Sequence, residues 1–275
     1  MAMAMAMASS SFVATDPLAH VAFNADATHL VVATSSGIRA LSCSPLEHVF
    51  SRGGFAGEVK SADLLLAQEG SSSEPEPPLV AVVLGDDTIR YCISQPPPHG
   101  QMMDAGNGGG GVVRAIRHVG DHVAVARDYR VTLYQVSRHK AAKLIMDVHT
   151  GPNQVGACAL ALVDGGQVFV LACPTPTVGK VQIWHKGRAA AVRVHAHDLT
   201  VACVELSGDG QLLATADDMG SYAFICSTTD GLVRQELRVC CTRAVVSSMA
   251  FSFDSKWLAV SSDRAAVHLF NAQWT

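Results

Sequence analysis

The sequence is poor in charged and aromatic residues. Of its 275 residues, 16% are charged and 6% are aromatic, whereas 49% are hydrophobic. Such a hydrophobic share excludes a disordered chain and is sufficient for a large buried core. The net charge of −4 at pH 7 argues against a nucleic-acid-binding protein with a broad basic surface, although a small local basic site is compatible with it.

The N-terminus lacks the basic residues of a secretory signal, because the first Lys or Arg of the chain is Arg39. We therefore expect residues 1–15 to form a disordered tail. The sequence also lacks an uninterrupted apolar run of about 18 residues, the length that predicts a membrane-spanning helix. Its most apolar stretch, Val155 to Cys173, is broken by Asp164-Gly165-Gly166 and predicts two strands joined by a turn.

Motifs of metal binding and catalysis are missing as well. None of the eight cysteines belongs to a C-x-x-C pair, and without a signal peptide we expect them to be reduced, buried and cytosolic. His195, His197 and Cys203 are too irregularly spaced to indicate zinc. Neither G-x-S-x-G nor H-E-x-x-H occurs, and the glycines at 108–111 are not followed by G-K-[S/T]. We therefore predict no cofactor, no metal and no enzymatic activity.

What the sequence does contain is a repeat. HLVVATSSG begins at His29, QLLATADDMG at Gln211 and KWLAVSSDRA at Lys256, and each follows a turn and precedes an alternating strand. Ala214 and Ala259 hold equivalent positions about 45 residues apart, which is the spacing of four-stranded propeller blades. The repeat therefore predicts an all-β protein built from such blades.

Weaker groups of strands fill the space between these markers. We expect strands at 79–84 and 88–93, at 112–118, 122–127 and 131–136, and at 158–162, 168–172 and 180–184. Ser, Pro and Gly residues mark low-complexity loops near 70–78 and 95–111. The total is about six blades within residues 16–275.

The C-terminal half carries a more specific resemblance. From His195 it reads HAHDLTVACVELSGDGQLLATADDMG, and from Ser247 it reads SSMAFSFDSKWLAVSSDRAAVHLF. Both stretches resemble blades five and six of the PROPPIN family, the seven-bladed WD-repeat β-propellers that include autophagy-related protein 18 and the WIPI proteins. HTGPNQVGACAL and GKVQIW extend the resemblance more faintly over nearly all of the chain after Asp16.

The resemblance implies a phosphoinositide site. PROPPINs bind phosphatidylinositol 3-phosphate and the 3,5-bisphosphate through two basic pockets on either side of an F-R-R-G motif. Guanidinium groups suit a phosphomonoester, and adjacent residues of a strand face opposite ways, so that two neighbouring arginines can serve two pockets.

In this sequence the motif aligns with Leu237-Arg238-Val239-Cys240. Arg238 takes the place of the first arginine, and His197 and Ser221 match the polar residues of its pocket. Val239 replaces the second arginine, which removes the main cation of the other pocket. Asp217 stands where the family has serine, and a carboxylate beside a phosphate lowers affinity.

The other pocket retains four of its residues, and alanine at 266 replaces a fifth that is usually a hydroxyl residue. The four retained residues are Ser261, Ser262, Arg264 and His268. The chain ends just past this strand, before the loop and the seventh blade of the family, so we expect a C-terminally truncated propeller.

Two functions follow from the resemblance. The first is a phosphoinositide-binding effector of autophagy and autophagosome formation, cytoplasmic and peripherally associated with pre-autophagosomal or endosomal membranes. The alternative is a protein–protein scaffold that has lost lipid binding. The expected partners are phosphoinositide headgroups and autophagy proteins, without nucleic acid and without a transmembrane segment.

Overall fold

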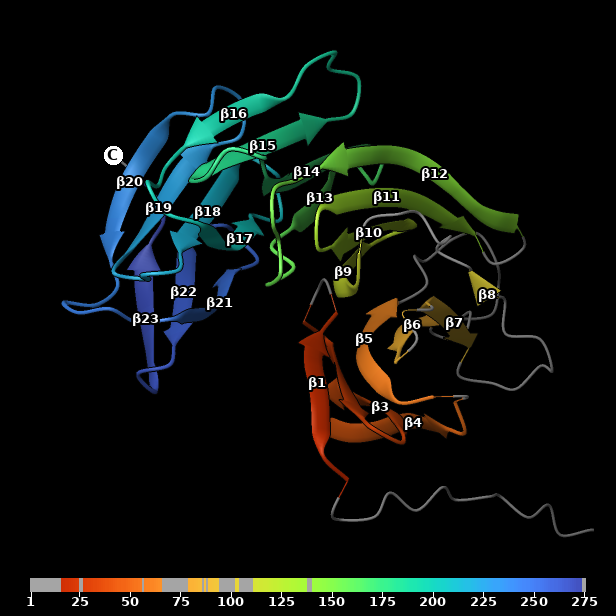
Figure 1. Ribbon diagram of the computed structural model, residues 1–275. Coiled ribbons are helices and arrows are strands. Elements are labelled where there is room, and N and C mark those ends of the chain that lie inside the picture. The colour runs from red at the N-terminus through yellow and green to blue at the C-terminus, as the bar shows by residue number, and fades with distance from the viewer. Residues whose placement is uncertain are drawn as a thin grey trace, which may run out of the picture. The chain divides into compact units, whose positions relative to one another are not determined.

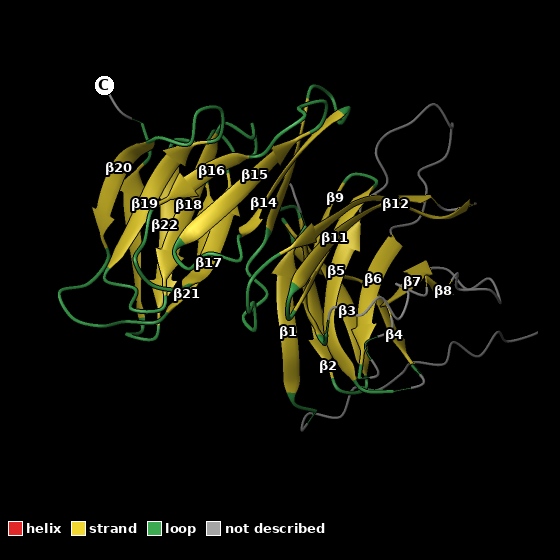
Figure 2. Ribbon diagram, turned by 45° about the horizontal axis from the view of Figure 1, so that its top comes forward, coloured by secondary structure: helices red, strands yellow, loops and turns green. Residues whose placement is uncertain are grey.

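The computed structural model describes residues 16–273 except 25–26, 56, 66–78, 86, 88, 94–101, 104–110 and 138–139. The described residues form antiparallel strands joined by turns and loops, without a helix (Figure 2). None of this part of the chain therefore forms a helix long and apolar enough to cross a membrane. The tail expected at 1–15 and most of the two low-complexity loops lie outside the described residues. The chain divides into two compact units, Met1–Asn107 and Gly108–Thr275.

The first unit contains two four-stranded sheets, red to yellow in Figure 1, each ordered as the strands follow one another in the chain. The first sheet consists of β1 (Leu18–Phe23), β2 (His29–Thr34), β3 (Gly37–Cys43) and β4 (Leu46–Gly53). The second consists of β5 (Val59–Leu65), β6 (Leu79–Leu84), β7 (Ile89–Ile93) and β8 (Met102–Met103).

The second unit contains four sheets with the same sequential strand order. They are formed by β9 (Val113–Val119), β10 (His122–Arg127), β11 (Arg130–Ser137) and β12 (Lys140–His149); by β13 (Ala159–Val163), β14 (Val168–Pro174), β15 (Lys180–His185) and β16 (Val192–His195); by β17 (Val201–Leu206), β18 (Leu212–Asp217), β19 (Tyr222–Ser227) and β20 (Val233–Arg238); and by β21 (Val246–Phe251), β22 (Trp257–Ser262) and β23 (Ala266–Asn271).

The number of four-stranded blades differs from the predicted number of blades. The sequence predicts about six, but the described residues form five four-stranded sheets, and the sixth sheet has only the three strands β21, β22 and β23. The repeat itself is confirmed. Its three marker segments form β2, β18 and β22, which are the second strands of their sheets and pair with the strands on both sides.

The cores lie between neighbouring sheets of the same unit. Ala214, Ala216 and Ile225 of one sheet pack with Leu258 and Val260 of the next, and all five are fully buried. The small second-strand residues of the repeat are thus explained by close packing between sheets, where a larger side chain would not fit.

Candidate anion-binding site

A seven-residue loop, 239–245, connects β20 to β21 and is held by backbone hydrogen bonds on both sides. On the β18–β19 side, the amide of Val239 donates to the carbonyl of Ser221 at 3.0 Å, and the amide of Ala244 donates to the carbonyl of Met219 at 2.9 Å. These bonds attach the loop to the turn that precedes β19. The loop therefore has a defined position at this end of the sheet.

The same loop is attached to the β22–β23 turn of the last sheet. The amide of Val245 donates to Oδ1 of Asp263 at 2.9 Å, and the amide of Asp263 donates to the carbonyl of Val245 at 3.0 Å. Nη2 of Arg264 donates to the carbonyl of Arg243 at 2.6 Å. The loop thus bridges two sheets, with Arg238 directly before it and Arg264 bonded to it.

Three arginines surround the 239–245 loop. Arg238 is the last residue of β20 and is exposed, and its guanidinium has no hydrogen bond or ion pair within the described part of the chain. Arg243 is exposed within the loop. The Arg264 side chain is 55% exposed and lies 3.9 Å from the equally exposed carboxylate of Asp263, a distance at which an exposed ion pair contributes little. The guanidinium groups of this cluster are thus accessible to an anion.

Val239 lies on the other side of the chain from Arg238, as alternation along a strand requires. Its side chain is 2% exposed and belongs to the core that includes Leu237, Val246 and Met249. In this chain, the position that the family motif gives to its second arginine is therefore occupied by a side chain of the hydrophobic core. Val239 cannot supply the positive charge of that arginine.

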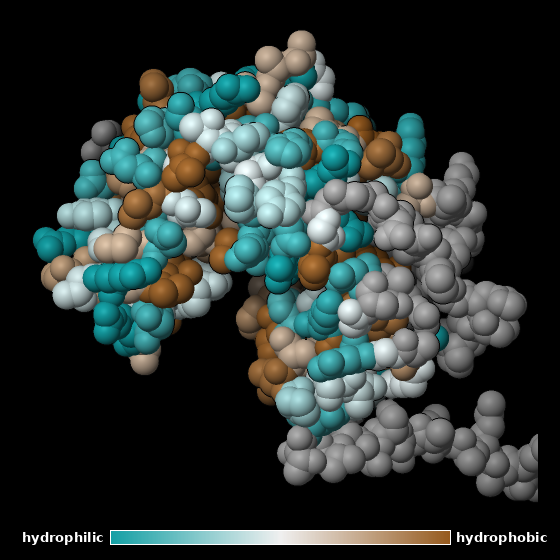
Figure 3. Space-filling view, in the orientation of Figure 1, coloured by the Kyte–Doolittle hydropathy of each residue, from teal (hydrophilic) through white to brown (hydrophobic). Residues whose placement is uncertain are grey.

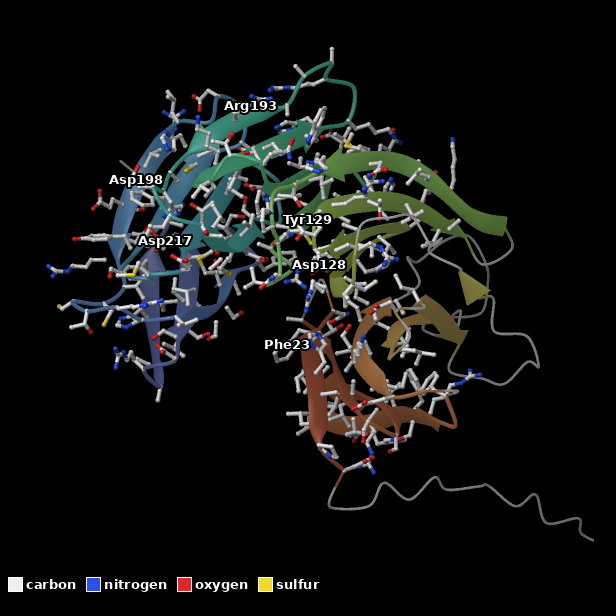
Figure 4. The ribbon with its side chains drawn as sticks, in the orientation of Figure 1. Phe23, Asp128, Tyr129, Arg193, Asp198 and Asp217 are labelled. Atoms are coloured by element: carbon white, nitrogen blue, oxygen red, sulfur yellow. The ribbon has the colours of Figure 1, made fainter. Side chains whose placement is uncertain are left out.

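His197 is buried, with 4% exposure, and both of its ring nitrogens have partners. Nε2 is 3.0 Å from Oγ1 of Thr215, and Nδ1 is 3.4 Å from Oδ2 of Asp217, which is labelled in Figure 4. The ring packs edge-on against Phe224, with centroids 4.9 Å apart. Burial lowers the pKa of His197, although the Asp217 carboxylate opposes the shift. The imidazole is therefore neutral and internal at neutral pH.

The Asp217 carboxylate is also occupied by local contacts. Its Oδ1 accepts the amides of Met219 at 3.1 Å and Gly220 at 2.9 Å, while Oδ2 faces His197. These bonds close the turn between β18 and β19. Asp217 therefore organises the turn whose carbonyl groups hold the 239–245 loop. The amides of this turn compensate part of the negative charge of the Asp217 carboxylate.

The remaining expected residues are spread along the last sheet. Ser262 is buried, and its Oγ accepts the amide of Arg264 at 3.4 Å, at the same end of the sheet as the loop. Ser261 Oγ lies 2.9 Å from Oγ of Ser247, and His268 stacks on Phe270 in the middle of β23, with ring centroids 6.2 Å apart. Of this set, only Ser262 and Arg264 lie at the turn that contacts the loop.

Within the described residues, no group of three or more His, Cys, Asp and Glu side chains is arranged to hold a metal ion. The chemistry available at this end of the two sheets is that of guanidinium groups, backbone amides and hydroxyls. Such a donor set binds oxyanions, and phosphate in particular.

A family model described as PROPPIN matches residues 17–275. The chain belongs to the PROPPIN family. Its sequence is 29% identical to autophagy-related protein 18e of Arabidopsis thaliana over 259 residues, which are 91% of this chain and 64% of that protein. It is 26% identical to autophagy-related protein 18 of Phaeosphaeria nodorum, covering 91% of this chain and 62% of the relative. The chain thus spans less than two thirds of the length of these two relatives.

Solved structures of two other proteins show the same fold. Kluyveromyces lactis Hsv2 superposes with a TM-score of 0.71 at 18% identity, covering 94% of this chain and 75% of that one. A complex of KlAtg21 with the coiled-coil of AgAtg16 gives a TM-score of 0.70 at 16% identity, covering 93% and 81%. This PROPPIN is therefore an all-β propeller, as the repeat predicts.

Sequence reasoning missed one residue of the arginine cluster. Arg243 follows the aligned motif in the run Cys240-Cys241-Thr242-Arg243, but a lone loop arginine carries no signal in the sequence. Its position becomes meaningful only because its carbonyl accepts Arg264. In this PROPPIN, the cations at the rim therefore come from three separate segments.

Proposed function

We propose that this PROPPIN is a non-enzymatic binding propeller of autophagy that recognises the phosphate of 3-phosphorylated phosphoinositides at the rim around Arg238. The observation that carries the proposal is the exposed Arg238 guanidinium without a protein partner, next to a loop that adds Arg243 and holds Arg264. A charge-assisted, two-pronged contact of this kind is what a phosphomonoester requires. The autophagy-related relatives support the cellular process.

The predicted site residues take different parts in this proposal. Arg238 and Arg264 contact the phosphate, and the Ser221 hydroxyl donates to it from the turn that holds the loop. His197 and Ser262 maintain the backbone around the site, since their polar atoms bond within the protein. Ser261 and His268 lie farther along the last sheet, and in this proposal they contribute to a second, weaker contact with the lipid headgroup.

Vesicle flotation tests the proposal. Vesicles with phosphatidylinositol 3-phosphate, with the 3,5-bisphosphate, or with unphosphorylated phosphatidylinositol are compared at equal lipid content. We expect recovery only with the phosphorylated lipids, and a loss of affinity of about tenfold or more in Arg238→Ala, because a hydrogen bond to a charged group contributes about 1.5–3 kcal/mol.

Arg234→Ala is the matched control. Arg234 is an exposed arginine of the same strand, but it forms an ion pair with Asp230, so its loss should change affinity by less than about twofold. Equal recovery with and without 3-phosphorylated lipid, or an unchanged affinity in Arg238→Ala, would overturn the proposal.

A second function is favoured by a specific observation. The buried Val239 leaves one pocket without its main cation, and a structural neighbour, KlAtg21, was solved with the coiled-coil of AgAtg16. We infer that a protein scaffold on the same propeller is the alternative. It predicts that co-precipitation of an autophagy coiled-coil partner persists in Arg238→Ala, whereas failure to bind such a partner in either form argues against it.

A further inference from the structure

One end of the sheets of the second unit carries exposed apolar side chains. Because neighbouring strands are antiparallel, six successive loops emerge at this end: 128–129, 150–158, 175–179, 196–200, 218–221 and 239–245. Each loop has one large apolar residue whose exposure lies between 37% and 61%. These residues form what we call the apolar row: Tyr129, Val155, Val178, Leu199, Met219 and Val245. Single exposed apolar residues are common on protein surfaces, but one on every successive loop of the same end indicates a contact surface.

The first three loops of the apolar row are neighbours in space. The amide of Asn153 donates to the carbonyl of Asp128 at 2.6 Å, which joins the second loop to the first. A Cβ atom added at Gly151 would lie 3.3 Å from the Cα of Pro176, so the second loop also contacts the third. These three loops therefore form one continuous surface.

The other loops continue this surface. The amide of His197 donates to the carbonyl of Gly179 at 3.3 Å, and the amide of Asp218 donates to the carbonyl of Thr200 at 3.0 Å. These bonds link the third, fourth and fifth loops, and the fifth holds the sixth through the backbone bonds described above. Each residue of the apolar row is thus presented by a loop that is fixed to its neighbours.

The opposite end of the same sheets has a different composition. Its turns read DGGQ at 164–167, SGDGQ at 207–211 and TTDGL at 228–232. Among the loop residues of that end that the structure describes, only Leu232 and Phe253 are large, apolar and exposed. The row is therefore a property of one end and not of the loops in general.

Exposed charges divide the surface of the apolar row into two parts. Asp198, which is labelled in Figure 4, and Asp218 are exposed, and each directly precedes an apolar residue of the row. At the Val245 end of the row, Arg243 and Arg264 are exposed instead. A partner therefore meets apolar side chains throughout, carboxylates in the middle and guanidinium groups at one end.

This order of charges favours a segment of another protein over a bilayer or a second copy of the chain. A bilayer would bring anionic headgroups or hydrocarbon against the two carboxylates, and both are unfavourable for a negative charge. Two copies related by a two-fold axis through the centre of the row would bring the carboxylates of both copies together. A protein segment can place lysine or arginine there.

We propose that this end of the second unit is a docking surface for a segment of a partner protein that carries apolar side chains and charges of both signs. Its apolar side chains cover the apolar row, its basic side chains pair with Asp198 and Asp218, and its acidic side chains pair with Arg243 and Arg264. Methionine, tyrosine and arginine are residue types that are enriched at such interfaces. The inference goes beyond phosphoinositide recognition, because Val178 and Leu199 take no part in the proposed lipid site.

Selection from a phage-displayed library of random peptides tests the docking surface, with the full chain as the target. We expect the selected peptides to combine apolar residues with basic residues and to have acidic residues toward one end. Fluorescence polarisation of the synthesised peptides then measures their affinity. The double variant Val178→Ser/Leu199→Ser should weaken binding about tenfold or more, because it removes apolar side chains from the centre of the contact.

The matched control is Leu232→Ser/Phe253→Ser, which removes two exposed apolar side chains from the opposite end and should change affinity by less than about twofold. A charge exchange tests the pairing. Asp198→Lys/Asp218→Lys should weaken binding about tenfold, and peptides whose basic residues are replaced by glutamate should recover it. Urea denaturation checks the folding of each variant, and Val155→Ser is a second variant of the row that should also weaken binding.

Several outcomes would overturn the docking surface. One is a selection that enriches no peptide on the wild type over the Val178→Ser/Leu199→Ser variant. Recovery of the wild type but not of this variant on phosphatidylcholine vesicles would assign the row to a membrane. Self-association that this variant abolishes, measured by analytical ultracentrifugation, would assign it to a second copy. Because peptide binding is measured without lipid, a failed phosphoinositide flotation bears only on the proposed function.

Discussion

At the scale of single residues, His197 shows how an expected ligand-binding group can be a structural one. Both ring nitrogens have protein partners and the side chain is buried. We expect His197→Ala to lower the free energy of unfolding by about 2–3 kcal/mol, because it removes packing and leaves Thr215 and Asp217 without their partner. Urea denaturation measures the change.

The control for this substitution is His195→Ala. His195 lies two residues earlier, at the end of β16, and is exposed, so its removal should change stability by less than about 0.5 kcal/mol. If His197→Ala is as stable as the control but loses phosphoinositide binding, the imidazole contacts the lipid, and the structural role assigned here is wrong.

Glu205 gives a pH-dependent prediction at the same scale. It lies on β17, and burial raises its pKa to about 7, while Arg117 opposes the shift. Because the pKa is higher in the folded than in the unfolded state, the protonated carboxyl stabilises the fold fully below the ordinary pKa of 4.5. This contribution is lost as the pH rises through about 7.

We therefore expect Glu205→Gln, which cannot ionise, to stabilise the protein by about 1–2 kcal/mol at pH 8 and by less at about pH 5. Differential scanning calorimetry at the two pH values measures the difference. Glu236→Gln, at an exposed position of β20, is the control and should have little effect at either pH. An equal gain for Glu205→Gln at both pH values would contradict the assignment.

At the scale of elements, the 239–245 loop depends on Asp263, whose Oδ1 accepts the amide of Val245. Asp263→Ala should open the loop and speed hydrogen exchange of its amides about fivefold, the equivalent of about 1 kcal/mol. Asp254→Ala is the control, because Asp254 closes the turn at the opposite end of the same sheet, with Ser252 and Lys256. If both variants leave exchange in the loop unchanged, the Asp263 contact does not hold it.

The elements also show what the sequence can predict. The inner strands were predictable because they alternate or form short apolar runs, and the predicted strand at 122–127 matches β10. The outermost strands β4, β12, β16 and β20 were not predicted. In β20 only Leu237 is buried, so a strand at the outer edge of its sheet has no hydrophobic period to reveal it.

The site was predictable to the same extent as its strands. Arg264 follows a recognisable strand, whereas Arg238 ends the unpredicted strand β20 and was found only through the aligned motif; the structure places both at the 239–245 loop. The roles of Asp217 and His197 depend on a contact between segments 20 residues apart in the chain. The local sequence pattern contains no information on such a contact, which becomes visible only in the folded structure.

At the scale of the whole molecule, charge separates specific from nonspecific membrane binding. The net charge is −4 at pH 7, and hydrophobic and hydrophilic residues are interspersed on the face shown in Figure 3. On the proposed function, attraction to an anionic bilayer therefore comes from the arginine cluster and not from the net charge of the chain. Such attraction reaches only about 8 Å at physiological salt.

We thus expect phosphatidylserine vesicles of the same surface charge to recover little protein at about 0.15 M salt, where vesicles with phosphatidylinositol 3-phosphate recover most of it. The double variant Arg243→Ala/Arg264→Ala should weaken phosphoinositide binding and its salt dependence together, because both reflect the number of cations at the contact. Flotation across a salt series measures both quantities. Equal recovery on the two kinds of vesicle would mean that the chain senses surface charge alone. A phosphomonoester site must instead distinguish a single dianionic headgroup from the same charge spread over many lipids.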